Sequence, residues 1–140
     1  MAVTNIAICV VGYLFGCKGK TFCCYFDKNK YVCSMKTEHI IDHIKNSILK
    51  FVPAKCIYLF GSHAYGNPTE NSDFDIYLVT PDDVADFSQL YAEIIGDLRV
   101  KKIFFIDLLL SSETAFNSRK QKFILERTIS QKGKIIYEQH

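Results

Sequence analysis

The chain has 140 residues, a length that predicts one domain built around one hydrophobic core. Apolar residues make up 49% and charged residues 23%, a composition typical of globular proteins that argues against disorder and coiled coils. The formal net charge of +2 is too small to indicate nucleic-acid or membrane binding by itself, and no apolar run reaches the roughly 20 residues of a spanning helix. These figures predict a small soluble protein, which we expect in the cytoplasm.

Residues 1–34 differ in composition from the rest of the chain. They hold four Lys and one Asp, whereas residues 35–140 hold 13 basic and 14 acidic groups. Five of the six cysteines also lie in this segment: Cys9, Cys17, Cys23, Cys24 and Cys33. No C-x-x-C pair occurs among them, which argues against a zinc site.

Three interpretations of residues 1–34 stay open. Residues 14–17 (LFGC) are loosely similar to a lipoprotein cleavage box, although no Lys or Arg precedes the apolar stretch as in a signal peptide. Apolar runs separated by Gly, Lys and Asn turns are also typical of a small β-meander. Met35 is a further candidate for the natural start, because the organised pattern begins there, and residues 1–34 are then a mis-assigned extension.

From Met35 onward, the spacing of apolar residues predicts helices that alternate with short strands. Helices are expected over 36–51, 84–98 and 113–131, and strands over 56–60, 74–79, 103–110 and 134–137. The second helix carries an apolar stripe that we expect in the core: Phe87, Leu90, Tyr91, Ile94 and Ile95. The alternation predicts an α/β or α+β sandwich.

Two carboxylates stand at the start of the second expected strand. Asp73 and Asp75 are two residues apart, so the period of a strand places both side chains on one face. Like charges on one face repel each other unless a cation holds them. Mg²⁺ takes such oxygen ligands and keeps positions open for substrate phosphates. An Asp-x-Asp pair is also common in turns, so the pair alone is a weak signal.

A third carboxylate interrupts the next apolar run. Asp107 lies within 103–110, and an uncompensated buried carboxylate there would cost several kcal/mol, so we expect it to have a partner. A neighbouring strand that sets Asp107 beside Asp73 and Asp75 would complete a carboxylate cluster for two metal ions.

Gly61 and Ser62 add a candidate phosphate site. A glycine at a strand end lets the backbone turn sharply and approach a ligand closely, and N–H groups at a helix start near Ser62 would face an anion. A phosphate site beside a two-metal cluster favours phosphoryl or nucleotidyl transfer from a nucleoside triphosphate. The pattern G-S-x3-G-x5-S-D-x-D fixes six positions, with chance odds on the order of 10⁻⁵ in a chain of this length.

The strings GSHAYG and SDFDIYLV together resemble the signature of the DNA polymerase beta-like nucleotidyltransferases, specifically the minimal nucleotidyltransferase group. The resemblance covers roughly residues 35–138 and implies a nucleotidyltransferase fold, a small mixed sheet with helices packed against it. It also implies roles for seven residues. The nucleotide-binding residues would be Gly61, Ser62, Gly66 and Ser72. The catalytic residues and ligands of two Mg²⁺ ions would be Asp73, Asp75 and Asp107, with Asp107 also assisting the nucleophile.

The same resemblance implies an acceptor. Only 33 residues follow Asp107, too few for the additional helical domain that holds RNA or an antibiotic in larger relatives, and no basic patch with interleaved aromatics indicates nucleic acid. Minimal nucleotidyltransferases pair with HEPN-type ribonuclease toxins, so the chain is expected to transfer AMP from ATP to a toxin tyrosine, as a type VII-like antitoxin. The alternative is a catalytically weak or silent module that neutralises its partner by binding.

One position departs from the family pattern. Members commonly have Arg where this chain has Tyr65, and tyrosine cannot offer a fixed cation to a phosphate. Either His63 or a basic residue elsewhere substitutes for that cation, or nucleotide binding is weakened.

Overall fold

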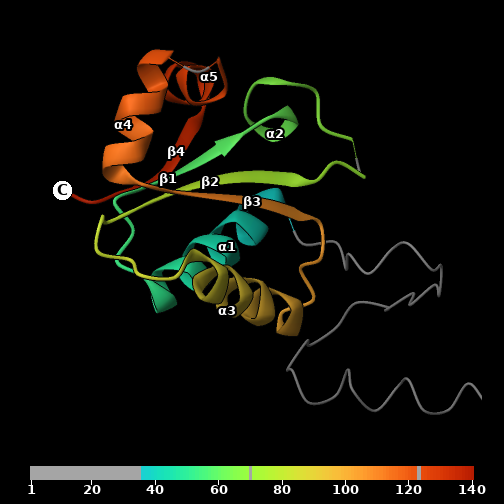
Figure 1. Cartoon of the computed structure of the whole chain (residues 1–140). Coiled ribbons are helices and arrows are strands. Elements are labelled where there is room, and N and C mark those ends of the chain that lie inside the picture. Colours follow the sequence, from blue (N-terminus) through green and yellow to red (C-terminus); the bar gives the residue numbers. More distant parts are fainter. Residues whose placement is uncertain (1–35, 70, 123) are drawn as a thin grey trace, which may run out of the picture. The chain divides into compact units, whose positions relative to one another are not determined.

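The computed structural model describes residues 36–69, 71–122 and 124–140, so the expectations for residues 1–34 lie outside the described residues. Helices and strands alternate along the described chain (Figure 1). In order they are α1 (Thr37–Phe51), β1 (Cys56–Phe60), α2 (Ser62–Tyr65), β2 (Phe74–Thr80), α3 (Phe87–Val100), β3 (Ile106–Ser112), α4 (Glu113–Lys122), α5 (Ile124–Lys132) and β4 (Lys134–Glu138). None of these helices is both long and apolar enough to cross a membrane.

The strands form one mixed sheet in the order β3-β2-β1-β4. β1 is antiparallel to both β2 and β4, whereas β2 and β3 are parallel. A parallel pair needs a long crossover connection, and α3 supplies it between β2 and β3. The predicted mixed α/β fold is therefore confirmed.

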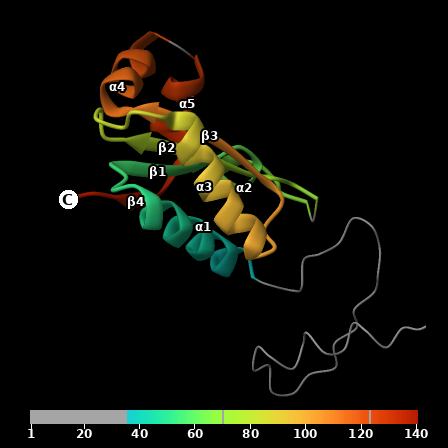
Figure 2. The same ribbon diagram turned by 60° about the horizontal axis from the view of Figure 1, so that its bottom comes forward.

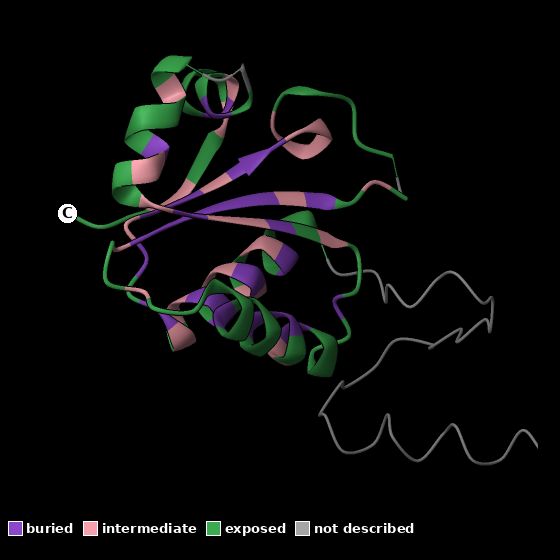
Figure 3. Ribbon diagram, in the orientation of Figure 1, coloured by how far each residue is buried: buried purple, intermediate pink, exposed green. Residues whose placement is uncertain are grey.

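Helices cover both faces of the sheet. α1 and α3 lie side by side on one face, and α4 and α5 lie on the other (Figures 1 and 2). Alternate strand residues supply the two cores, so the central strands β1 and β2 are buried along most of their length (purple in Figure 3). Ile57, Ile76 and Leu78 belong to the core under α1 and α3, while Tyr77 and Val79 belong to the core under α4 and α5. Neighbouring residues on β2 thus face different helix layers.

A charged cluster joins α1 to α3 beside the larger core. The Ser47 hydroxyl donates to Asp97 Oδ2 at 2.8 Å, and the Lys50 and Lys101 ammonium groups each lie 2.7 Å from an Asp97 oxygen. These donors hold the pKa of the Asp97 carboxyl well below its usual range. The cluster fixes the two helices against each other at a position where apolar packing ends.

Three expectations from the sequence were wrong in detail, two about apolar residues and one about a helix. Phe87 and Tyr91 are exposed, because only the stripe formed by Leu90, Ile94, Ile95 and Leu98 packs into the core. β3 begins at Ile106, which leaves Phe104 and Phe105 exposed in the preceding loop. The expected helix over 113–131 is two helices, α4 and α5, which both lie on the same face of the sheet.

We expect Asp97→Asn to lower the free energy of unfolding by about 1 kcal/mol at neutral pH, because it removes the charge that two ammonium groups share. A lowered carboxyl pKa stabilises the fold above the unfolded-state value of about 3.9, and that stabilisation is lost as the pH falls below it. Urea titrations at several pH values should therefore show the wild-type advantage at pH 7 and its decline below about pH 4. A stability difference between wild type and Asp97→Asn that grows as the pH falls would contradict the ion pairing of Asp97.

Candidate active site

The turn after β1 requires a glycine. Gly61 has φ 67° and ψ −147°, a backbone conformation that side chains disfavour, and the one-turn helix α2 starts directly after it. A Cβ built at Gly61 would lie 2.0 Å from Asp75 Oδ2. The Asp75 carboxylate therefore packs against the backbone of the turn, and the predicted phosphate turn and the predicted metal ligands occupy one site.

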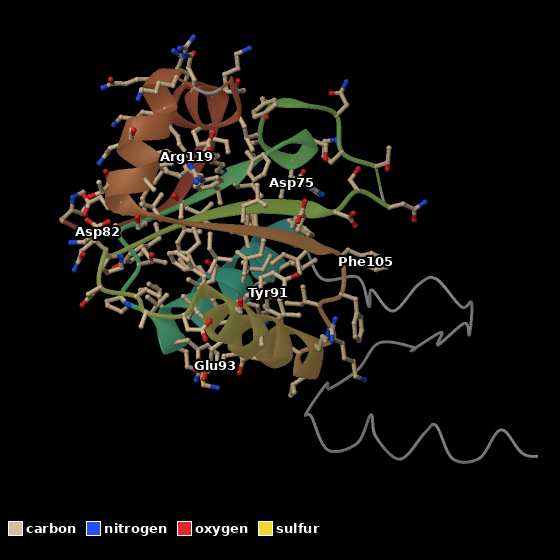
Figure 4. All side chains as sticks on the ribbon, viewed as in Figure 1. Asp75, Asp82, Tyr91, Glu93, Phe105 and Arg119 are labelled. Carbon is tan, nitrogen blue, oxygen red and sulfur yellow. The ribbon has the colours of Figure 1, made fainter. Side chains whose placement is uncertain are left out.

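The sheet register brings the acidic residues together. Asp75 is the cross-strand neighbour of Asp107 in the parallel pairing of β2 with β3, and Asp73 directly precedes β2. The pKa of Asp75 is raised, first by burial and then by the negative charges of Asp107 and Asp73. Parallel neighbours lie on the same face, and Figure 4 shows Asp75 on the side of the sheet that α2 and α4 flank. The predicted juxtaposition of the three carboxylates is thus present.

Asp107 differs from its expectation in one respect. It is exposed, not buried, because β3 is an edge strand and the helices α4 and α5 do not cover this end of the sheet. The expected desolvation cost, from which a compensating group beside the Asp107 carboxylate was predicted, therefore does not arise. Its carboxylate is open to solvent and to a ligand.

His63 supports the site from α2. Its ring stacks on Phe74 with centroids 4.1 Å apart and an angle of 12° between the planes, and its Nε2 lies 3.2 Å from the Ser72 carbonyl oxygen. The charge of His63 opposes the rise in the pKa of Asp75. The sequence indicated His63 only as a possible substitute cation, and its role in linking α2 to the start of β2 required the structure.

The other predicted nucleotide-binding residues have local structural roles. Gly66 leaves no room for a side chain, since an added Cβ would lie 2.9 Å from Ser62 Cα. Ser72 Oγ accepts a hydrogen bond from the Thr69 N–H at 2.9 Å and so holds the loop before β2. Tyr65 ends α2 with its side chain 47% exposed. Gly61 is the predicted phosphate residue whose backbone is seen packed against a carboxylate, that of Asp75.

The donor set fits a hard divalent cation. Within the described ranges, no three His, Cys, Asp or Glu side chains are already arranged to hold a metal ion. Asp73, Asp75 and Asp107 nevertheless offer only carboxylate oxygens, the ligands that Mg²⁺ prefers. Burial raises the pKa of Asp75 most, and the repulsion from Asp107 and Asp73 that adds to this rise is the interaction that a bound cation would relieve.

Comparison with known proteins identifies the family. A family model described as "Nucleotidyltransferase domain" matches residues 41–131, a segment that contains the Gly61 turn and all three carboxylates. The chain belongs to the nucleotidyltransferase domain family. It is therefore an enzyme of the nucleotidyltransferase class, as the signature around Gly61 and Asp75 predicted.

The chain is also similar to individual known proteins. A protein of Methanocaldococcus jannaschii named "Putative protein adenylyltransferase MJ0604" is 36% identical over 83 residues, which are 59% of this chain and 78% of the relative. Among solved structures, a mutant of the toxin-antitoxin MntA-HpeT has 20% identity and a TM-score of 0.48, and a toxin-antitoxin with AMP-PNP has 22% identity and a TM-score of 0.48. Each comparison covers 71% of this chain and 74% of the other.

We expect Gly61→Ala to damage this nucleotidyltransferase site. The substitution forces a side chain into a positive-φ position and against Asp75 Oδ2, so it should destabilise the fold by about 1–3 kcal/mol and displace the carboxylate. Gly96→Ala is the matched control, because Gly96 lies in α3 with open space around it. That variant should gain about 0.5–1 kcal/mol. Thermal unfolding of both variants tests the assignment, and equal stability of the two would refute it.

Proposed function

We propose that this chain is a Mg²⁺-dependent protein adenylyltransferase of the cytoplasm that transfers AMP from ATP to a hydroxyl group of a partner protein. The observation that carries the proposal is the packing of Asp75 against Gly61 and beside Asp107, which unites a phosphate turn with a carboxylate cluster. The relative named as a protein adenylyltransferase supports the choice of nucleotide and of a protein acceptor.

The residues of the site divide the work of the reaction. Gly61 and Ser62 would contact the triphosphate, while Asp73, Asp75 and Asp107 would hold two Mg²⁺ ions. When bound, Mg²⁺ would supply Lewis-acid stabilisation of the negative charge on the phosphates. Asp107, open to solvent at the end of the edge strand, is the carboxylate that an incoming acceptor reaches.

The transfer forms one bond and breaks another. The acceptor hydroxyl oxygen attacks the α-phosphorus of ATP, and the bond from that phosphorus to the oxygen bridging the α- and β-phosphates breaks. Pyrophosphate leaves with the bond electrons, and the hydroxyl proton passes to Asp107 and then to solvent. Positioning and electrostatic stabilisation account for most of such catalysis, which agrees with a site built from a fixed turn and fixed carboxylates.

The acceptor that we propose is a tyrosine of a HEPN-type toxin, for which this chain acts as a type VII-like antitoxin. Phe104 and Phe105 support a protein acceptor, because they are 51% and 38% exposed in the loop that leads to Asp107. The Phe105 carbonyl accepts a hydrogen bond from the Phe74 N–H at 3.0 Å, so this loop is fixed beside the carboxylates. Exposed aromatic side chains are enriched where proteins bind proteins.

A second candidate is a silent module that neutralises its partner by binding alone. Tyr65 favours it, because the segment 61–75 contains no Lys or Arg to pair with a triphosphate. The complete carboxylate set favours the enzyme.

Asp75→Asn and Asp107→Asn should each reduce AMP transfer by at least about a hundredfold while the fold persists, because each removes a charge that holds the metal ions. The assay incubates the full chain with labelled ATP, Mg²⁺ and the product of the neighbouring gene, and it measures label on the partner. Asp83→Asn is the matched control, since Asp83 is exposed near Asp82 at the opposite end of the sheet from Asp75 (Figure 4).

Asp83→Asn should transfer AMP to the partner as efficiently as the wild type. Wild-type turnover in Asp75→Asn would exclude the proposed mechanism. Co-purification of the two proteins without any transferred label would favour the silent module.

Phe104→Ser should weaken transfer to the partner without changing ATP binding, because Phe104 contributes exposed apolar surface beside Asp107 and little to the core. We expect the KM for the partner to rise about tenfold, the effect of losing one well-packed contact. Ile135→Thr is the control, since Ile135 is 49% exposed on β4, at the opposite edge of the sheet. Equal effects of the two substitutions would argue against docking at this loop.

A further inference from the structure

The helix layer over the active-site face contains a buried carboxylate. Glu126 of α5 is only 7% exposed, and its Oε1 accepts a hydrogen bond from the Tyr77 hydroxyl at 3.3 Å. Burial raises the pKa of Tyr77, so its hydroxyl stays protonated at neutral pH and continues to donate. Tyr77 is two residues after Asp75 on β2, so the two side chains lie on the same face, about 6.5 Å apart along the strand. Glu126 is therefore held, through Tyr77, on the face of the sheet that carries Asp75.

Glu126 in turn holds a cation. Arg119 Nη1 of α4 lies 3.8 Å from Glu126 Oε1, which offsets the cost of a buried negative charge. The Arg119 side chain remains 49% exposed, so only part of its guanidinium is occupied by Glu126. A guanidinium has five N–H donors and can bind a carboxylate and a phosphate together. Figure 4 shows Arg119 and Asp75 on the same side of the sheet.

The nucleotide site needs such a cation. The segment 61–75 contains no Lys or Arg but includes Glu70, Asp73 and Asp75, and Asp107 adds a further negative charge from β3. A triphosphate that enters this acidic region keeps negative charge that the metal ions do not fully neutralise. A basic side chain from outside the turn is the group that can bind it.

Other basic residues near this layer are placed differently. Lys134 pairs with Leu59, a residue of the core under α1 and α3, so the register turns it toward the opposite face. Lys120 lines a cavity of about 530 Å³ with Lys55 and Glu138, at the end of β1 remote from Gly61. Arg127 donates to the Gln121 carbonyl. Arg119 is the basic residue that the contacts of Tyr77 and Glu126 direct to the face of Asp75.

We propose that Arg119 binds the β- and γ-phosphates of the nucleotide, and that Glu126 and Tyr77 are positioning residues that hold its guanidinium over the active-site face. This inference rests on the proposed adenylyltransferase activity, because it assumes that ATP is the nucleotide. In this inference Arg119 of α4, held by Glu126 of α5, supplies the positive charge that family members commonly take from an Arg at the position of Tyr65.

Calorimetric titration of the full chain with ATP and with AMP, both with Mg²⁺, tests the inference. Arg119→Ala should raise the Kd for ATP about tenfold, the effect of losing one charged hydrogen bond, and change the Kd for AMP less than about twofold. Arg119→Lys, which keeps the charge but loses the fork of N–H donors, should bind ATP more tightly than Arg119→Ala and more weakly than wild type. Lys120→Ala on the same helix should bind both nucleotides as wild type does.

Glu126→Gln tests the positioning role, because the amide keeps the size of the side chain and an acceptor for Tyr77 but loses the charge that holds Arg119. It should weaken ATP binding less than Arg119→Ala does, and the double variant should bind no worse than Arg119→Ala alone. Unchanged ATP affinity in Arg119→Ala, or equal losses for ATP and AMP, would overturn the inference while leaving the proposed function intact. Failure of the wild-type chain to bind ATP would overturn both.

Discussion

The parallel pairing of β2 with β3 is the constraint on which the site depends. In this register Asp75 faces the same side as Asp107, and a slip by one residue would turn Asp107 to the opposite face. The pairing in turn requires the crossover helix α3, whose position against α1 is fixed by apolar packing and by the Asp97 cluster. Residues remote from the carboxylates therefore determine the geometry of the carboxylates.

The carboxylate packed against the Gly61 turn imposes a second constraint, and this one acts against stability. Glycine adopts a positive φ readily, but the turn holds Gly61 directly against Asp75, whose charge is opposed by burial and by two other acids. A sequence selected only for stability would avoid a partly buried carboxylate beside two others, since burial and like-charge repulsion each cost free energy. The arrangement of turn and acids is understandable if the turn binds phosphate and the acids bind cations, because bound cations then offset the negative charge of the carboxylates.

The sequence was sufficient for features that depend on local pattern. The bounds of β1 follow from its apolar run, and the end of α1 follows from Pro53, which cannot continue a helix. Strand periodicity likewise places Asp73 and Asp75 on one face, but it does not show which strand brings Asp107 beside them. Features that depend on which surfaces the helices cover were not predictable in this way. Asp107 was expected to be buried because its run is apolar, but the order of the strands places β3 at an edge. Strand order is a non-local property that periodicity does not encode.

The residues of β2 face two sides of the sheet, so those that build the larger core lie on the opposite face from those of the candidate site. Ile76 and Leu78 enter the core with α1 and α3, whereas Asp75 and Tyr77 face the other helix layer. Asp75 and Tyr77 therefore share one face with Glu126, which is tolerated there because Tyr77 and Arg119 satisfy it. Glu126 was detectable in principle, since it lies three residues before the buried Ile129 on the inward side of α5. A buried acidic residue needs a hydrogen-bond or charge partner, and the partner of Glu126 on β2 is Tyr77. This contact connects α5 to the strand that carries Asp75.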